Sequence, residues 1–317
     1  MHEVSEARTK AGQPVQQYFG KWPFWRVFGV QEPASVLFSL ANLREHMRGL
    51  RRLHAMQTPS WAQPWFLLVG YVSANGWVWS CVFHARDKPL TEVFDYHTAT
   101  AIQMTTLITT CVRIGRLQGA WATSMAALIV SLFCYHVLYL STMEHFDYGY
   151  NMKVNLCTGA LTIVLWVGWL VYPWVEATAA ARCRHAGRSR RGSHDATVDA
   201  GGRAGVRAGA GRAWVVPRVG ARALSQFLGG LVLAVLLEVF DFAPVWHTFD
   251  AHSLWHASTA AIMHLWYDFA VLDLTNEGRL EREHAEHGEG NVRRTRSEPM
   301  TQTCARQHPH LWYATDA

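Results

Sequence analysis

Apolar residues gather into seven stretches of roughly twenty residues, which alternate with polar or arginine-rich connections. A helix needs about 20 residues to cross a hydrocarbon core, so each stretch is a candidate membrane span. The expected spans cover residues 26–43, 65–84, 95–112, 119–141, 155–175, 223–245 and 250–273. The pattern therefore predicts an all-α polytopic membrane protein, a seven-transmembrane helix bundle. The first span is the weakest, because Gln31, Glu32 and Pro33 lie inside it.

Three stretches lie outside this predicted transmembrane domain of residues 26–273. Residues 1–25 form an N-terminal segment expected on the lumenal side, and residues 274–317 form a polar tail expected in the cytosol. Residues 178–222 are rich in Arg, Gly and Ala, cannot bury much apolar surface, and are predicted to form a disordered cytosolic loop. A sharper hypothesis is that this loop binds anionic lipid headgroups.

The arginines predict the orientation of the bundle. Three connections are rich in positive charge: the one after the first span, the one after the third, and the Arg-rich loop; the other connections carry few Lys or Arg residues. Positive loops stay in the cytosol, so the amino end and the intervening connections should face the lumen. The formal net charge of +5 arises in these connections rather than on one binding face, so nucleic acid is not an expected partner.

Ionisable residues in three distant segments form the candidate active site. Ser80 and His84 lie four residues apart near the end of the second span, and Asp95 opens the third. His252 and His256 are also four residues apart, in the first turns of the seventh span, so they share one helical face. The predicted topology places all five residues at the lumenal end of the bundle, which marks them as a functional site.

Three imidazoles with an open fourth position are typical of catalytic zinc, so His84, His252 and His256 are the predicted zinc ligands. Asp95 is the candidate to orient water or take its proton, and Ser80 is the candidate donor to an oxyanion. The predicted chemistry is hydrolysis of a carbonyl ester or amide. Each residue also has a structural interpretation: Ser80 as a packing hydroxyl, Asp95 as a helix N-cap, and the His pair as a chance spacing.

Further ionisable residues lie in or near the last span. His247 could line the mouth of the site, while Asp268 and Asp273 should lie toward the cytosolic end. His264 is an additional candidate.

These residues belong to a wider resemblance that covers about residues 15–273. Together with residues 20–24 (GKWPF), 31–39 (QEPASVLFS), 146–152 (FDYGYNM) and 250–256 (DAHSLWH), they resemble the Per-like family of GPI-anchor lipid remodelling factors. That family is similar to alkaline ceramidases and progestin/adipoQ-type receptors, with which it forms the CREST superfamily.

The resemblance implies an enzyme of the endoplasmic reticulum or Golgi membrane that acts on GPI anchors already attached to protein. The implied reaction is hydrolysis of the sn-2 acyl ester, which is a lipid carboxylic ester bond. Membrane lipids are expected to surround the protein. The implied roles are zinc binding for His84, His252 and His256, contact with zinc-bound water for Asp95, and assistance at the carbonyl for Ser80.

The resemblance also implies a signal peptide and a Cys-containing lumenal segment, neither of which is visible here, so we expect that the N-terminal segment is truncated. The Arg/Gly/Ala-rich loop is an expected insertion relative to the family. Two alternative functions stay open: a ceramidase-like lipid amidase that uses the same site, and a non-catalytic seven-helix receptor or lipid-binding protein with structural zinc. The receptor branch is expected to carry its metal on the cytosolic side.

Overall fold

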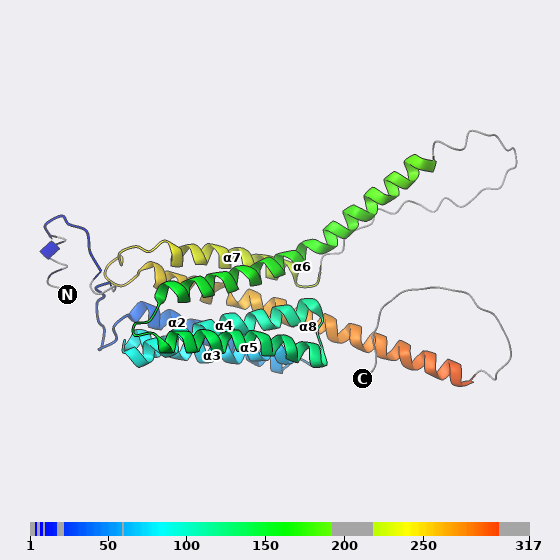
Figure 1. Ribbon diagram of the computed structural model, residues 1–317, viewed down its shortest axis with the longest axis horizontal. Coiled ribbons are helices and arrows are strands. Elements are labelled where there is room, and N and C mark those ends of the chain that lie inside the picture. Colours follow the sequence, from blue (N-terminus) through cyan, green and yellow to red (C-terminus); the bar gives the residue numbers. More distant parts are fainter. Residues whose placement is uncertain are drawn as a thin grey trace.

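The computed structural model describes residues 4, 7–8, 10–17, 22–58, 60–191 and 218–297. In this part of the chain seven long helices form an elongated bundle (Figure 1). They are α2 (Pro33–His54), α3 (Gln63–Ala85), α4 (Pro89–Gly115), α5 (Gly119–Thr142), α6 (Tyr148–Arg191), α7 (Ala221–Val239) and α8 (Ala251–Ser297).

The bundle is that of a multi-pass membrane protein. Four of the described helices are long and apolar enough to cross a membrane: α3, α5, α7, and α6 as far as Pro173. The other three, α2, α4 and α8, carry polar residues on their buried faces. Helices α4 and α8 carry three of the five predicted site residues, and α3 carries the other two. The predicted all-α membrane bundle is confirmed.

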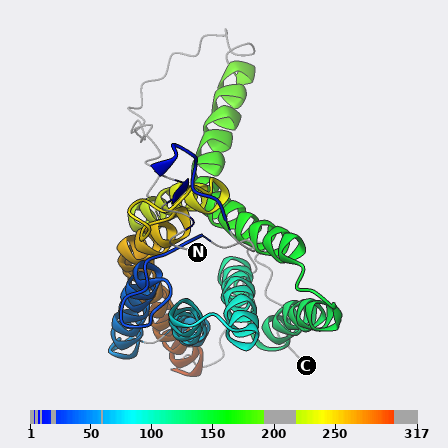
Figure 2. The ribbon, with the colours of Figure 1, turned by 90° about the vertical axis from the view of Figure 1, so that its left-hand side faces the viewer.

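The helices are arranged in an arc, seen end-on in Figure 2. Helices α7, α8, α2, α3 and α4 contact one another in that order, and α4 also contacts α5 and α6. Glycines allow close approach at the centre of the arc: a Cβ at Gly49 of α2 would overlap the ring of Tyr267 in α8. A Cβ at Gly70 of α3 would meet Leu50 of α2 at 2.6 Å. The tight packing brings α2, α3 and α8, and with them the candidate site, together.

The first predicted span, 26–43, was wrong in its bounds. The helix begins at Pro33, after a turn in which Phe28 and Gly29 have positive φ, and it continues to His54. Its buried face is polar, so a search for apolar stretches misplaces it. The buried polar residues of α2 are Ser35, Ser39, Asn42 and His46. The arginines that were expected in the following connection, Arg44, Arg48, Arg51 and Arg52, lie within the helix.

Other boundaries also differ from the predicted ones. Helix α4 begins at Pro89 with Lys88 as its N-cap, so Asp95 lies in the second turn and is not a cap. Helix α7 ends at Val239, short of the predicted residue 245. Helix α6 continues to Arg191, so the first part of the stretch 178–222 is helical, while residues 192–217 lie outside the described part. Helix α8 likewise extends into the expected tail, as far as Ser297.

Candidate metal centre

The three predicted zinc ligands converge at one end of the bundle. His84 lies in the last turn of α3, and His252 and His256 lie in the first two turns of α8. One ligand nitrogen from each imidazole can be chosen so that all three lie within 4.8 Å of one another. The Nε2 atoms of His252 and His256 are 2.9 Å apart. His84 and His256 are buried, whereas His252 is half-buried and leaves the cluster accessible from one side.

Local structure fixes the two helix ends that carry these histidines. Asp250, the residue before α8, accepts a hydrogen bond at Oδ1 from the backbone N–H of Ser253 (2.8 Å). The backbone N–H of Asp250 donates to the Ser253 hydroxyl (3.0 Å), so each residue caps the other. At the end of α3, the backbone N–H groups of Gln31 and Glu32 donate to the carbonyls of Ala85 and His84. The segment that leads into α2 is therefore fastened beside His84.

Each imidazole holds a polar partner at Nδ1. The Nδ1–H of His84 donates to the Glu32 carboxylate (2.6 Å), and that of His252 donates to Glu238 at the end of α7 (2.8 Å). The Nδ1 of His256 lies 2.8 Å from the hydroxyl of Ser39 in α2. Partners of this kind fix the tautomer and orientation of metal-binding histidines and raise their basicity.

The opposite ring nitrogens face one another. The Nε2 of His84 is buried and has no hydrogen-bond partner among the described residues. A buried nitrogen of this kind costs free energy unless a ligand satisfies it. The Nε2 atoms of His252 and His256 lie within hydrogen-bond distance, so one ring donates a hydrogen to the other unless a cation takes its place between them. The donor set therefore fits a metal ion such as zinc, which three imidazoles bind in catalytic sites.

The two predicted catalytic residues, Ser80 and Asp95, interact with the cluster in different ways. The Ser80 hydroxyl is buried and lies 3.0 Å from the Ser39 hydroxyl, so it connects to His256 through Ser39. The half-buried Asp95 carboxylate interacts electrostatically with His84 and His252. All five predicted site residues therefore lie in one region of the structure.

The further candidates have other roles. Asp273 forms ion pairs with Arg113 of α4, and Asp268 pairs with Arg52 of α2, both at the far end of the bundle. His264 bonds to the Ala261 carbonyl on its own helix. His247 lies in the α7–α8 connection, where its carbonyl accepts a hydrogen bond from the backbone N–H of Trp25 (2.8 Å). It fastens the N-terminal segment, and it is not in the histidine cluster.

Sequence reasoning missed three residues of the site: Glu32, Ser39 and Glu238. Glu32 and Ser39 both lie in the stretch 31–39, which carried part of the family resemblance. Glu238 is an ionisable residue at the end of an apolar helix, which is itself a signal of function.

Comparison with known proteins gives the family. The model of the Per1-like family matches residues 1–274. "Protein PER1 homolog" of Schizosaccharomyces pombe is 36% identical over 268 residues, 81% of this chain and 67% of that protein. "Post-GPI attachment to proteins factor 3" of Drosophila melanogaster is 38% identical over 162 residues, 50% of this chain and 49% of that protein.

A mammalian relative, "GPI-specific phospholipase A2-like PGAP3" of Bos taurus, is 40% identical over 163 residues, 51% of each chain. The chain thus spans about half the length of the animal relatives it matches. The match of the family model extends over every helix of the candidate site, from α2 through the histidines of α8. The chain therefore belongs to the Per1-like family.

Proposed function

We propose that this protein remodels the lipid of GPI anchors after their attachment to protein, by zinc-dependent hydrolysis of the sn-2 acyl ester. The observation that carries the proposal is the histidine cluster, in which three Nδ1 atoms hold polar partners and the Nε2 atoms face one another. Membership of the Per1-like family supports the substrate, since relatives bear the names of a post-GPI attachment factor and a GPI-specific phospholipase A2-like protein. The proposed location is the endoplasmic reticulum or Golgi membrane, with the cluster facing the lumen.

The histidine partners prepare the cluster for a cation. Because Glu32 and Glu238 accept hydrogen bonds from Nδ1–H, the lone pairs of His84 and His252 are left on Nε2. The two carboxylates also bring negative charge close to the imidazoles. A zinc ion held there supplies a Lewis acid and hydroxide at neutral pH.

A chain of hydrogen bonds through two hydroxyl groups leaves the O–H of Ser80 available as a donor. When Nε2 of His256 is a metal ligand, its Nδ1–H donates to the Ser39 oxygen, and the Ser39 O–H donates to the Ser80 oxygen. The Ser80 O–H is then left to donate to the oxygen of a substrate carbonyl, where negative charge develops during hydrolysis. In this proposal Asp95, which interacts electrostatically with His84 and His252, accepts a proton from the attacking water and passes it to the leaving alkoxide.

The test uses purified full-length protein in detergent micelles, supplied with zinc and a GPI-anchored protein. We expect near-stoichiometric zinc and release of free fatty acid with formation of the lyso-GPI form, followed by mass spectrometry. The variant His252→Ala/His256→Ala should lose both zinc and product. His264→Ala is the matched control, because His264 lies on the same helix, is exposed, and is outside the cluster.

The outcomes separate the parts of the proposal. A well-folded wild type without zinc would contradict the metal centre. Zinc that is lost in the double variant, with no lyso-GPI formed under any metal condition, would retain the centre and reject the ester hydrolase. Release of fatty acid from ceramide but not from GPI would move the assignment to a lipid amidase.

A further inference from the structure

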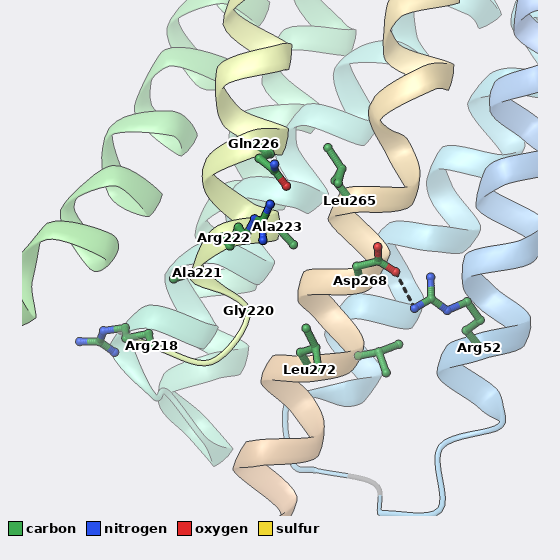
Figure 3. Close-up of a pocket in the computed structure, with 11 residues that line it drawn as sticks. Arg52, Arg218, Gly220, Ala221, Arg222, Ala223, Gln226, Leu265, Asp268 and Leu272 are labelled. Carbon is green, nitrogen blue, oxygen red and sulfur yellow. Dashed lines mark ion pairs between the residues drawn. The ribbon is translucent and has the colours of Figure 1, made fainter. Parts of the chain in front are cut away.

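A second site lies at the end of the bundle opposite the histidine cluster. Here an open cavity of about 540 Å³ is bordered by α2, α7 and α8 (Figure 3). It lies near Asp268 on α8, twelve residues beyond His256, which is about 18 Å along a helix that rises 1.5 Å per residue. The cavity is therefore distinct from the candidate metal centre.

The lining of this cavity has an excess of positive charge. Three arginines line it, Arg52, Arg218 and Arg222, with Asp268 as the one acidic residue among the lining side chains. Arg52 and Asp268 neutralise each other in an ion pair of 2.7 Å, drawn as a dashed line in Figure 3. The other two arginines of the lining are Arg218 and Arg222.

These two arginines lie at the beginning of α7. The guanidinium of Arg218 is held over the ring of Trp169 in α6, at 4.5 Å from its centroid. Arg222 is exposed in the first helical turn and makes no ion pair with any described residue. The N-cap of α7 is Gly220, which has no side chain to cap the first N–H groups, so the helix terminus adds to the positive potential.

Apolar surface flanks the arginines on two sides. A neighbouring cavity of about 360 Å³ lies between α6 and α7 and shares Arg218, Ala221 and Arg222 with the first. The walls of the two cavities are mainly aliphatic. They include Val167, Leu170 and Val171 on α6 and Leu265, Val271 and Leu272 on α8. The arginines therefore lie where two apolar cavities meet.

We infer that this site binds an anionic glycerophospholipid of the cytosolic leaflet. The lipid phosphate lies against Arg218 and Arg222, and one acyl chain occupies each cavity. A soluble anion would use the charge but leave the aliphatic walls exposed, and a neutral lipid would use the walls but not the charge. Basic pockets between helices on the cytoplasmic side are typical of such lipid sites, and the arginine distribution predicts that this end is cytosolic.

The test measures lipid retention by full-length protein. Protein is purified from mixed micelles that contain equal amounts of phosphatidylserine and phosphatidylcholine, and native mass spectrometry counts the lipids that stay bound. The wild type should retain one phosphatidylserine in preference to phosphatidylcholine. In Arg218→Gln/Arg222→Gln the preference should fall about 30-fold, since each arginine near such a headgroup contributes about 1 kcal/mol, or about fivefold.

Two further variants keep the result interpretable. Arg222→Glu changes only an exposed side chain and should also abolish the preference, even if the double variant folds poorly. Arg48→Gln/Arg51→Gln removes two arginines from the same end of α2, outside both cavities, and should leave the preference unchanged. An equal loss in this control, or an unchanged preference in Arg222→Glu, would overturn the site. If soluble glycerophosphoserine competed as well as the lipid, the cavities would have no part in binding and the phospholipid would be rejected as the occupant.

Discussion

Each imidazole of the histidine cluster is held by a residue from a different segment of the chain. Glu32 precedes α2, Ser39 lies within α2, and Glu238 ends α7, whereas the histidines come from α3 and α8. The orientation of the cluster therefore depends on the packing of four helices. It follows that a metal affinity measurement reports on these partners as well as on the histidines.

The hydroxyl of Ser39 provides a test of this dependence. In Ser39→Ala, His256 loses its Nδ1 partner and the connection to Ser80 is broken. We expect zinc affinity to fall about 10–100-fold, the range found for partners of metal-bound histidines. Zinc retained by the purified protein is measured against graded chelator concentrations.

Ser35→Ala is the control, because Ser35 is buried one turn earlier on the same face of α2. It should match the wild type in zinc affinity. Equal zinc affinity in Ser39→Ala and the wild type would show that Ser39 does not position His256.

The sequence was sufficient to predict that the three histidines converge, but not which residues hold them. His252 and His256 share a helical face by spacing alone, and His84 reaches the same end of the bundle once the spans are in order. Glu238 was not placed at the level of the histidines because the predicted span 223–245 ends six residues beyond the end of α7 at Val239. Ser39 is one of many serines, and only the packing of α2 against α8 distinguishes it.

At the scale of elements, a buried ion cluster joins α4 to α8. Arg113 donates from Nε and Nη2 to the two carboxylate oxygens of Asp273 (2.7 and 2.8 Å) and from Nη2 to Glu277 (2.8 Å). All three side chains are about 95% buried, whereas Arg116, which also pairs with Glu277, is 56% exposed. The two arginines contact the same acidic residue in different surroundings.

Arg113→Leu should strongly destabilise the bundle. The substitution leaves the buried Asp273 carboxylate without its arginine partner and Glu277 with Arg116 alone, which costs about 3–5 kcal/mol in the free energy of unfolding. Arg116→Leu breaks an ion pair with one exposed partner and should cost about 0–1 kcal/mol. Denaturation by SDS in mixed micelles measures both values, and similar values for the two variants would contradict a structural role specific to the buried cluster.

The boundaries of α2 were mispredicted because polarity and secondary structure disagree in this helix. Helix α2 places Leu37 and Leu40 outward and its serines inward, the reverse of a soluble helix. An apolar stretch marks a membrane helix well only when most of its faces meet lipid, as in α5. Helix α2, which contributes Ser39, is therefore harder to delimit from sequence than α3, which carries Ser80 and His84 and ends within two residues of its predicted bounds.

At the scale of the molecule, two polar clusters lie at opposite ends of the bundle. His256 and Asp273 are seventeen residues apart on α8, or about 26 Å along the helix. This approaches the thickness of a hydrocarbon core, about 30 Å, so each cluster lies near one membrane surface. The fold places the two clusters at opposite ends of the bundle. Which of these ends faces the lumen stays a prediction from the distribution of arginines.

Cysteine labelling tests the orientation directly. His145→Cys places a thiol in the exposed α5–α6 connection, on the histidine side, and Arg51→Cys places one in the last turn of α2, on the other side. Both are made in a background without the six natural cysteines. In sealed microsomes, a membrane-impermeant maleimide should label Arg51→Cys at once but His145→Cys only after permeabilisation, because the bilayer separates the two ends. The reverse pattern would place the histidine cluster in the cytosol, where a GPI anchor on a lumenal protein cannot reach it, and would favour the receptor-like alternative over the hydrolase.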